Sequence, residues 1–253
     1  MKSSLVIDHG NSSLKVYVFQ GDDYMRGERI SSVKELEGFL GETKPSDAVF
    51  ASSGKIEEDE INEISKIIGF RPLVFSQSTP LPIRLHYDTL ETLGLDRIAG
   101  VVAAVAQMEE GGEEDFILVA DAGTALTLDI ARKGEGFMGG NISAGIALKL
   151  KALHSFTAAL PEISIEGKCP EFGTDTVTAM RSGAIRGTIA EIESAFRKAS
   201  LRYGKGCIVL TGGDAEIIKK YIDSSLPVKM CPILVAEGLN RILYYNENIH
   251  KAN

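Results

Sequence analysis

The chain has 253 residues, of which 44% are hydrophobic and 25% are charged, and its formal net charge is −8 at pH 7. This acidic balance, without a dense run of Lys or Arg, argues against a nucleic-acid surface, and no apolar stretch approaches the roughly 20 residues of a membrane-spanning helix. The three cysteines are far apart and form no C-x-x-C pair, so we expect no disulfide framework and no zinc site, as in a cytoplasmic protein.

The first expected element is a hairpin with an acidic tip. An apolar run over residues 5–7 ends in Asp8-x-Gly10, and a strand-like run that ends over residues 16–19 follows it. This pattern predicts two antiparallel strands with a carboxylate and open backbone amides at the turn. A single turn of this kind is common and has no chemical meaning by itself.

The rest of the first half alternates strands and helices. In chain order we expect a strand over 24–32, a helix over 33–40, a strand over 48–52, a helix over 57–68 and a strand over 73–75. Pro80 and Pro82 then enforce an extended loop that ends at Tyr87. A helix over 96–108 follows, with its apolar side chains on one face, and the acidic stretch 109–115 is expected as a linker.

The second half opens by repeating the acidic hairpin with an offset of 113 residues, from position 8 to position 121. The repeated positions are Leu5, Val6, Asp8 and Gly10 in the first copy and Leu118, Val119, Asp121 and Gly123 in the second. A turn without a role has no reason to recur with the same apolar flanks. Two such tips facing each other across a cleft could hold a phosphate chain and its metal from both sides.

The elements after the second hairpin again alternate. We expect a Gly-rich segment over 134–145, a helix over 146–154, a helix from an N-cap at Thr174 or Asp175 to 198, a strand over 208–210, a helix over 216–221, a strand over 232–235 and a helix over 237–245. Gly183 and Gly187 lie one turn apart on the long helix, at either an interdomain crossing or a subunit interface. Helices alternating with strands and hairpins indicate α/β layers with mixed sheets.

Three segments carry the residue types that a polyphosphate requires. The first holds a carboxylate for Mg²⁺, backbone amides that glycine leaves accessible, and an ammonium group. Its residues are Asp8, His9, Gly10, Asn11, Ser12, Ser13, Leu14 and Lys15. The second holds Asp121, Gly123, Thr124 and Thr127, while Asp129 is either a further ligand or a solvent-facing strand residue. The third is the Gly212-Gly213 pair, whose bare backbone could lie against a nucleobase. Lys15 either contacts phosphate or faces solvent.

In order and spacing, these motifs resemble those of the type III pantothenate kinases from residue 5 to about residue 240. The matching motifs are Asp8-x-Gly-Asn with Lys15, Gly94-Leu95-Asp96-Arg97, Asp121-Ala-Gly123-Thr124-Ala-x-Thr127-x-Asp129, Gly139-Gly140-x-Ile142, Asp175-Thr176 and Thr211-Gly-Gly213. The Asp-x-Gly and Gly-Gly parts are shared by the wider superfamily of sugar kinases, actin and heat-shock chaperones. The Gly-x-Asp-Arg segment narrows the resemblance to the pantothenate kinases.

The resemblance implies two duplicated actin-like (ribonuclease H-like) domains, 1–113 and 114–253, with mixed sheets flanked by helices and a cleft between the domains. It implies ATP-dependent phosphorylation of pantothenate to 4'-phosphopantothenate, the first step toward coenzyme A. It also implies a homodimer whose partner subunit helps to cover the substrate. The second domain would hold the adenosine site.

The resemblance also implies a role for each matching residue. ATP would bind Asp8 through Lys15 and Thr124, Mg²⁺ would bind Asp8 directly or through water, and a monovalent cation, K⁺ or NH₄⁺, would bind Asp121. Pantothenate would bind Tyr87, Gly94, Leu95, Asp96, Arg97 and Thr176, with Asp96 as the proton acceptor. Without the resemblance, the preferred interpretation of Asp96 is a helix N-cap, since Asp at a helix start is ordinary.

Three residues depart from the family pattern. His9 stands where an aliphatic residue is usual, Ser12 replaces Thr, and Ala144 replaces a proline that is often found near the Gly139-Gly140 loop. Two other functions are possible. A kinase for another small alcohol or a polyphosphate phosphatase of the same superfamily would not require the Gly-x-Asp-Arg segment. A nucleotide-gated regulator without turnover would be expected to lack the base, Asp96. Both Asp96 and the whole segment are present.

Overall fold

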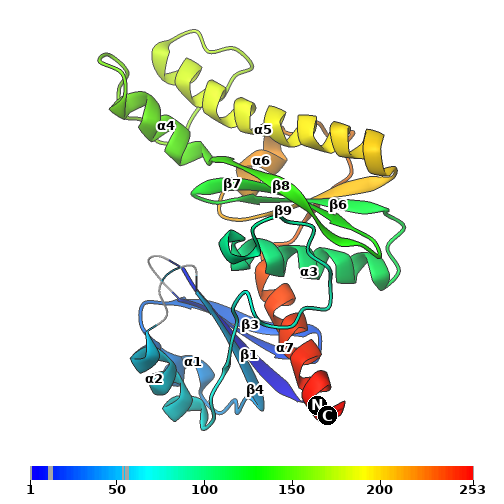
Figure 1. The fold of residues 1–253 in the computed structure, drawn as a ribbon. Coiled ribbons are helices and arrows are strands. Elements are labelled where there is room, and N and C mark those ends of the chain that lie inside the picture. Colours follow the sequence, from blue (N-terminus) through cyan, green and yellow to red (C-terminus); the bar gives the residue numbers. More distant parts are fainter. Residues whose placement is uncertain (1, 11–13, 53, 55–56, 253) are drawn as a thin grey trace. The chain divides into compact units, whose positions relative to one another are not determined.

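The computed structural model describes residues 2–10, 14–52, 54 and 57–252, and these residues form two compact units (Figure 1). The first unit comprises Met1–Ala103 together with Ile233–Asn253, and the second comprises Ala104–Pro232. The predicted halves, 1–113 and 114–253, differ from these units chiefly in the last helix, which belongs to the first unit.

The first unit is built on a five-stranded mixed sheet. Its strands are β1 (Ser3–His9), β2 (Leu14–Gln20), β3 (Asp23–Ile30), β4 (Asp47–Ser52) and β5 (Leu73–Val74), in the spatial order β3-β2-β1-β4-β5. The strands β1 and β2 pair antiparallel, which confirms the first predicted hairpin, and β1 pairs with β4 in parallel. Asp8 lies opposite Lys15 on β2 and Ala51 on β4, near the carboxyl end of β1.

Several helices and 3₁₀ turns lie wholly or partly in the first unit. They are a 3₁₀ turn η1 (Val33–Glu35), α1 (Leu36–Leu40), α2 (Glu58–Ile68), a 3₁₀ turn η2 (Leu90–Thr92), α3 (Leu95–Glu109) and α7 (Leu234–Ala252). One core joins Leu5 and Ile7 of β1 to apolar side chains of α1 and α2. Because side chains alternate along a strand, Ser4 and Asp8 lie on the opposite face, where Ser4 donates a hydrogen bond to Asn240 of α7 at 2.5 Å.

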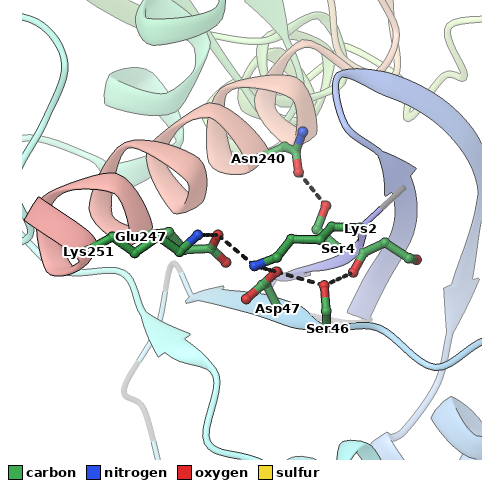
Figure 2. A network of polar contacts seen from close by, with 8 residues as sticks. Lys2, Ser4, Ser46, Asp47, Asn240, Glu247 and Lys251 are labelled. Carbon is green, nitrogen blue, oxygen red and sulfur yellow. Dashed lines mark hydrogen bonds and ion pairs between the residues drawn. The ribbon is translucent and has the colours of Figure 1, made fainter.

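A polar network also joins α7 to the start of strands β1 and β4 (Figure 2). The Nζ atom of Lys2 lies 3.4 Å from Oδ2 of Asp47 on β4 and 3.6 Å from Oε2 of Glu247 on α7. Oε2 of Glu247 also lies 3.5 Å from Nζ of Lys251, and Ser46 donates a hydrogen bond to Asp47 at 2.7 Å. These contacts join the two ends of the described chain within the first unit.

The second unit repeats the strand arrangement of the first. Its strands are β6 (Phe116–Ala122), β7 (Ala125–Arg132), β8 (Gly136–Ala144), β9 (Gly206–Thr211) and β10 (Val228–Met230), in the order β10-β9-β6-β7-β8. In each sheet the central strand, β1 or β6, is the first strand of the hairpin. The second strand of the hairpin lies on one side of it, and a parallel strand, β4 or β9, lies on the other. The predicted duplication is therefore present in the topology as well as in the sequence.

Two expectations for the second half need correction. The Gly-rich segment forms the edge strand β8, where glycine is normally depleted, and a pairing irregularity with β7 accompanies a positive φ of 106° at Gly139. The prediction of a strand over 232–235 is wrong. Residues Val228–Met230 pair with β9 instead, and α7 begins at Leu234, soon after Pro232.

Three helices pack on the second sheet: α4 (Ile146–Ser155), α5 (Thr176–Tyr203) and α6 (Ala215–Tyr221). The side chain of Asp175 caps α5 by accepting from the Thr178 amide at 2.9 Å, and the Thr178 hydroxyl accepts from the Asp175 amide in return. Asp175 is thus the N-cap. Within the described part of the chain, none of the helices combines the length and apolarity needed to span a membrane.

Candidate active site

The first acidic tip brings Asp8 and Lys15 together. Their strands pair so that the two residues are directly opposite, and Nζ of Lys15 lies 3.6 Å from Oδ2 of Asp8. Lys15 is largely exposed, with 45% of its side chain accessible, so its ammonium group can turn to an incoming anion. Gly10 follows β1, Leu14 is buried at the start of β2, and Asn11, Ser12 and Ser13 lie outside the described residues.

A second carboxylate, that of Asp96, lies near enough to influence Asp8. Burial raises the pKa of Asp8 above its ordinary value, the charge of Asp96 raises it further, and Lys15 opposes both effects. Burial and the charge of Asp8 likewise raise the pKa of Tyr17, which follows Lys15 on the same strand face, to about 12. The first unit therefore gathers negative charge at one point, which favours a bound cation.

Asp96 lies in the first turn of α3 and is exposed. Its Oδ1 atom accepts a hydrogen bond from the Arg97 amide at 2.9 Å, which leaves Oδ2 without a hydrogen bond among the described residues. A Cβ atom at Gly94 would lie only 2.6 Å from that Oδ1, so glycine at this position makes room for the carboxylate. Because α3 begins at Leu95, Asp96 is the second residue of the helix, so the N-cap interpretation of this residue is wrong, and Oδ2 stays available for a chemical role.

Asp96 also forms part of the wall of a cavity of about 470 Å³ in the first unit. This volume suits a small-molecule ligand. The cavity brings together three predicted residues, Gly94, Leu95 and Asp96. Its other lining residues, which the sequence analysis missed, are Ser52, Gly54, Phe75, Ser76, Gln77, Thr92 and Leu93.

Arg97 and Tyr87, which are predicted to bind pantothenate, contact each other. The Arg97 guanidinium carbon lies 5.7 Å from the centre of the Tyr87 ring, and Arg97 is only 7% exposed. A ring face over a guanidinium restrains its orientation. The Arg97 fork is thus held in a defined place directly after Asp96.

The second acidic tip places Asp121 against the turn after β9. Asp121 is paired with Thr127 on β7 and with Thr211 on β9. Gly212 has a φ of 89°, and a Cβ atom there would collide with the Asp121 carboxylate and the Ala122 carbonyl group. The Asp214 amide donates to that carbonyl oxygen at 2.9 Å, so the two Gly-containing turns are joined through the backbone.

The remaining predicted residues of the second unit occupy different settings. Thr124 is exposed at the hairpin tip, and its carbonyl oxygen accepts from the Gly145 amide at 3.0 Å. Asp129 is 1% exposed, so the solvent-facing interpretation of this residue is wrong. Thr176 is exposed at the first position of α5, next to its N-cap.

His9, a departure from the family pattern, contacts helix α2. Its Nδ1 lies 3.1 Å from Oε1 of Glu60, and its ring meets the edge of Phe50 at a centroid distance of 6.1 Å. The residue that follows Asp8 therefore connects the acidic tip to the neighbouring helix. Sequence reasoning identified His9 as unusual but gave no sign of Glu60 as its partner.

The first acidic tip offers few carboxylate donors to a metal ion. Among the described residues, no three His, Cys, Asp or Glu side chains gather into a group that could hold a metal alone. Mg²⁺ is normally bound by one or two carboxylates together with water and substrate phosphates. Asp8, beside a second carboxylate, fits that requirement.

The sequence was compared with known proteins. A family model described as type III pantothenate kinase matches residues 4–198. The type III pantothenate kinase of Porphyromonas gingivalis (strain ATCC BAA-308 / W83) is 35% identical over 257 residues, which cover 97% of this chain and 100% of that protein. The predicted resemblance is therefore confirmed along nearly the whole chain.

Solved structures agree on the fold. A Baf-family protein from Campylobacter jejuni superposes with a TM-score of 0.61 at 22% identity, covering 96% of this chain and 99% of the other. An inorganic polyphosphate/ATP-glucomannokinase from Arthrobacter sp. strain KM superposes with a TM-score of 0.51 at 12% identity, covering 99% and 100%. Together with the paired five-stranded sheets, these likenesses confirm two duplicated actin-like domains with mixed sheets flanked by helices.

Proposed function

The chain belongs to the type III pantothenate kinase family, and we propose that Asp96 is the general base of its reaction. The enzyme phosphorylates pantothenate with ATP to give 4'-phosphopantothenate, which begins coenzyme A biosynthesis. One observation carries the proposal: Asp96 lines a cavity of ligand size while its charge reaches Asp8 at the first acidic tip. A base must meet the acceptor on one side and the phosphate donor on the other.

The proposed step is a direct phosphoryl transfer. The oxygen of the terminal hydroxyl of pantothenate bonds to the γ-phosphorus, the bond from that phosphorus to the β,γ-bridging oxygen breaks, and ADP leaves with the electron pair. The hydroxyl proton passes to Oδ2 of Asp96, since Oδ1 is occupied by the Arg97 amide. A carboxylate is a weak base, but a loose transition state needs the alcohol oriented more than it needs the alcohol deprotonated.

The nucleotide site is proposed to use both acidic tips. Asp8, His9, Gly10, Asn11, Ser12, Ser13, Leu14 and Lys15 from the first tip and Thr124 from the second would bind ATP. Asp8 would hold Mg²⁺, directly or through water, and Mg²⁺ would offset phosphate charge. Asp121 would hold K⁺ or NH₄⁺, which reduces the repulsion between ATP and the carboxylates of an acidic protein.

The acceptor site is proposed to include Tyr87, Gly94, Leu95, Asp96 and Arg97. The Arg97 fork suits a carboxylate or amide oxygen of pantothenate, and its contact with Tyr87 restrains it. Thr176 would add a contact from the second unit. We place the enzyme in the cytoplasm, where its three thiols stay reduced.

A homodimer is also part of the proposal. Exposed apolar side chains concentrate on the second unit, at Ile142, Leu148, Phe156, Val177 and Leu201. The helix surface at Gly183 and Gly187 is open, with no atom within 4 Å of a Cβ built at either position. Apolar surface of this kind is typical of a protein interface.

The base is tested by following labelled phosphate from ATP to pantothenate with Mg²⁺ and K⁺. Asp96→Asn should lower kcat by about 10²–10⁴-fold, because it removes the proton acceptor, while the Kd for ATP stays close to that of the wild type. Asp59→Asn, an exposed change on α2, is the matched control and should leave both values unchanged. Full activity in Asp96→Asn would overturn the assignment.

The same assay tests the role given to Asp121. Replacing K⁺ with Na⁺ or Tris should lower the rate, since a cation that fits poorly leaves the repulsion between ATP and the carboxylates in place. Equal rates in all three buffers would contradict a monovalent cation at Asp121.

A further inference from the structure

The cavity beside Asp96 has a wall to which the proposed function gives no role. Asp96, Leu95 and Gly94 form one part of its lining, and the segment of Phe75, Ser76 and Gln77 after strand β5 forms another. The reacting hydroxyl is expected at Asp96. A part of the acceptor that extends from Asp96 into the cavity would then lie against the other lining residues.

Backbone and side-chain hydrogen bonds hold this wall in place. The Phe75 amide donates to the Phe50 carbonyl oxygen of β4 at 2.8 Å, and Phe75 is fully buried. The Ser76 amide donates to Oγ1 of Thr79 at 3.0 Å, and the Thr79 amide donates to the Ser76 carbonyl oxygen at 3.0 Å. Gln77 therefore lies in a closed turn between a buried anchor and a buried threonine, which fixes its backbone.

The side chain of Gln77 is exposed and makes no hydrogen bond within the described part of the chain. By contrast, the hydroxyl of Ser76 is shared with those of Ser78 and Thr79, and the hydroxyl of Ser52 accepts from the Gly54 amide at 3.1 Å. Of these polar side chains, that of Gln77 is the one with its hydrogen-bonding capacity unused. A carboxamide offers two N–H donors and one carbonyl acceptor from a single plane.

The carbonyl oxygen of such a carboxamide can accept from the N–H of a secondary amide. Pantothenate carries one amide, between the half that bears the reacting hydroxyl and the half that bears the carboxylate. Resting on the proposed function, we propose that Gln77 binds this amide and is a specificity-determining residue for the acceptor. The Gln77 carbonyl oxygen would accept from the amide N–H, while the amide oxygen points the opposite way in the planar trans amide and is left to other donors.

The test compares two acceptors and two enzymes. Wild-type enzyme and Gln77→Ala are assayed with pantothenate and with its ester analogue, in which oxygen replaces the amide N–H. Gln77→Ala should raise the KM for pantothenate about tenfold, the effect of removing about 1.4 kcal/mol of binding, with kcat and the KM for ATP within about twofold of wild type. The wild type should disfavour the ester by a similar factor, and Gln77→Ala should lose that preference.

Gln20→Ala is the matched control, because Gln20 ends strand β2 at the opposite end from Lys15 and does not line the cavity. An unchanged KM in Gln77→Ala, or an ester penalty of equal size in both enzymes, would overturn the inference. Either result would leave the kinase activity and Asp96 as its base intact. Conversely, a fully active Asp96→Asn would contradict the base without affecting recognition of the amide by Gln77.

Discussion

At the scale of single residues, Asp8 lies where its own charge is disfavoured. Burial raises its pKa, the neighbouring Asp96 adds to the effect, and a lysine at 3.6 Å compensates only in part. A carboxylate whose charged form is disfavoured in the folded protein lowers stability, and groups of this kind are typical of functional sites. Binding a cation at this point would relieve the repulsion.

Gly212 lies so close to Asp121 that the effect of a single substitution there can be predicted. Gly212→Ala should destabilise the protein by about 1–3 kcal/mol, because alanine is strained at a φ of 89° and its Cβ would collide with the Asp121 carboxylate. It should also weaken ATP binding, because the carboxylate must move. Chemical denaturation and the Kd for ATP measure the two effects.

Gly213→Ala is the matched control for that variant. Gly213 lies one residue further along, has no positive φ, and has no atom within 4 Å of a Cβ built on it. Its substitution should change the stability by less than about 0.5 kcal/mol. Equal losses in the two variants would show that the approach to Asp121 has no special importance.

The sequence allowed some residues to be identified and not others. Asp8, Asp96 and Asp121 stay predictions that rest on motifs of fixed spacing, and the structure places Asp96 near Asp8. The place of Gln77 on the cavity could not be foreseen, since it belongs to no motif and depends on the path of the loop. The burial of Asp129 was also not predictable, because alternation along a strand does not say which face a neighbouring layer covers.

At the scale of elements, local signals succeeded where one segment determines its own structure. The two hairpins, the capping box of α5 and the apolar face of α3 follow from nearby residues. The strand β8 does not, since its glycines have low strand propensity and its pairing with β7 holds it. The strand β10 was placed too late, because its three residues are defined by their pairing with β9.

Glu247 of helix α7 allows a prediction about the pH dependence of stability (Figure 2). Burial raises the pKa of Glu247, Asp47 adds to the effect, and Lys2 and Lys251 oppose it. The stability that Glu247 contributes is therefore full below its unfolded pKa of about 4.3 and is lost as the pH rises through the raised value. Glu247→Gln, which mimics the neutral form, should raise the Tm at pH 7–8 by about 1–3 °C.

The pH dependence distinguishes this explanation from a simple loss of ion pairs. The gain in Tm should shrink as the pH falls and disappear near about pH 3, well below the unfolded pKa, where Glu247 is protonated in both the folded and the unfolded chain. Glu216→Gln, an exposed change on α6, should have no effect at either pH. A lower Tm for Glu247→Gln at pH 7–8 would mean that the pairs with Lys2 and Lys251 outweigh burial.

At the scale of the whole molecule, the chain is one architecture used twice. Each sheet begins with an antiparallel hairpin whose first strand carries an aspartate near its end, and each continues into two parallel strands. The two copies have diverged around that shared position: Asp8 is opposite Lys15, whereas Asp121 is opposite Thr127 and Thr211. A basic partner in one copy and hydroxyl partners in the other give the two acidic tips different chemistry.

The most direct test of this account is a crystal structure of the enzyme with a non-hydrolysable ATP analogue, Mg²⁺ and K⁺. The account predicts a single nucleotide whose phosphates and cations are contacted by Asp8 and Lys15 on one side and by Asp121 and Thr124 on the other, with Asp96 near the γ-phosphate. A nucleotide bound by one acidic tip alone, with the other tip on a remote surface, would contradict it.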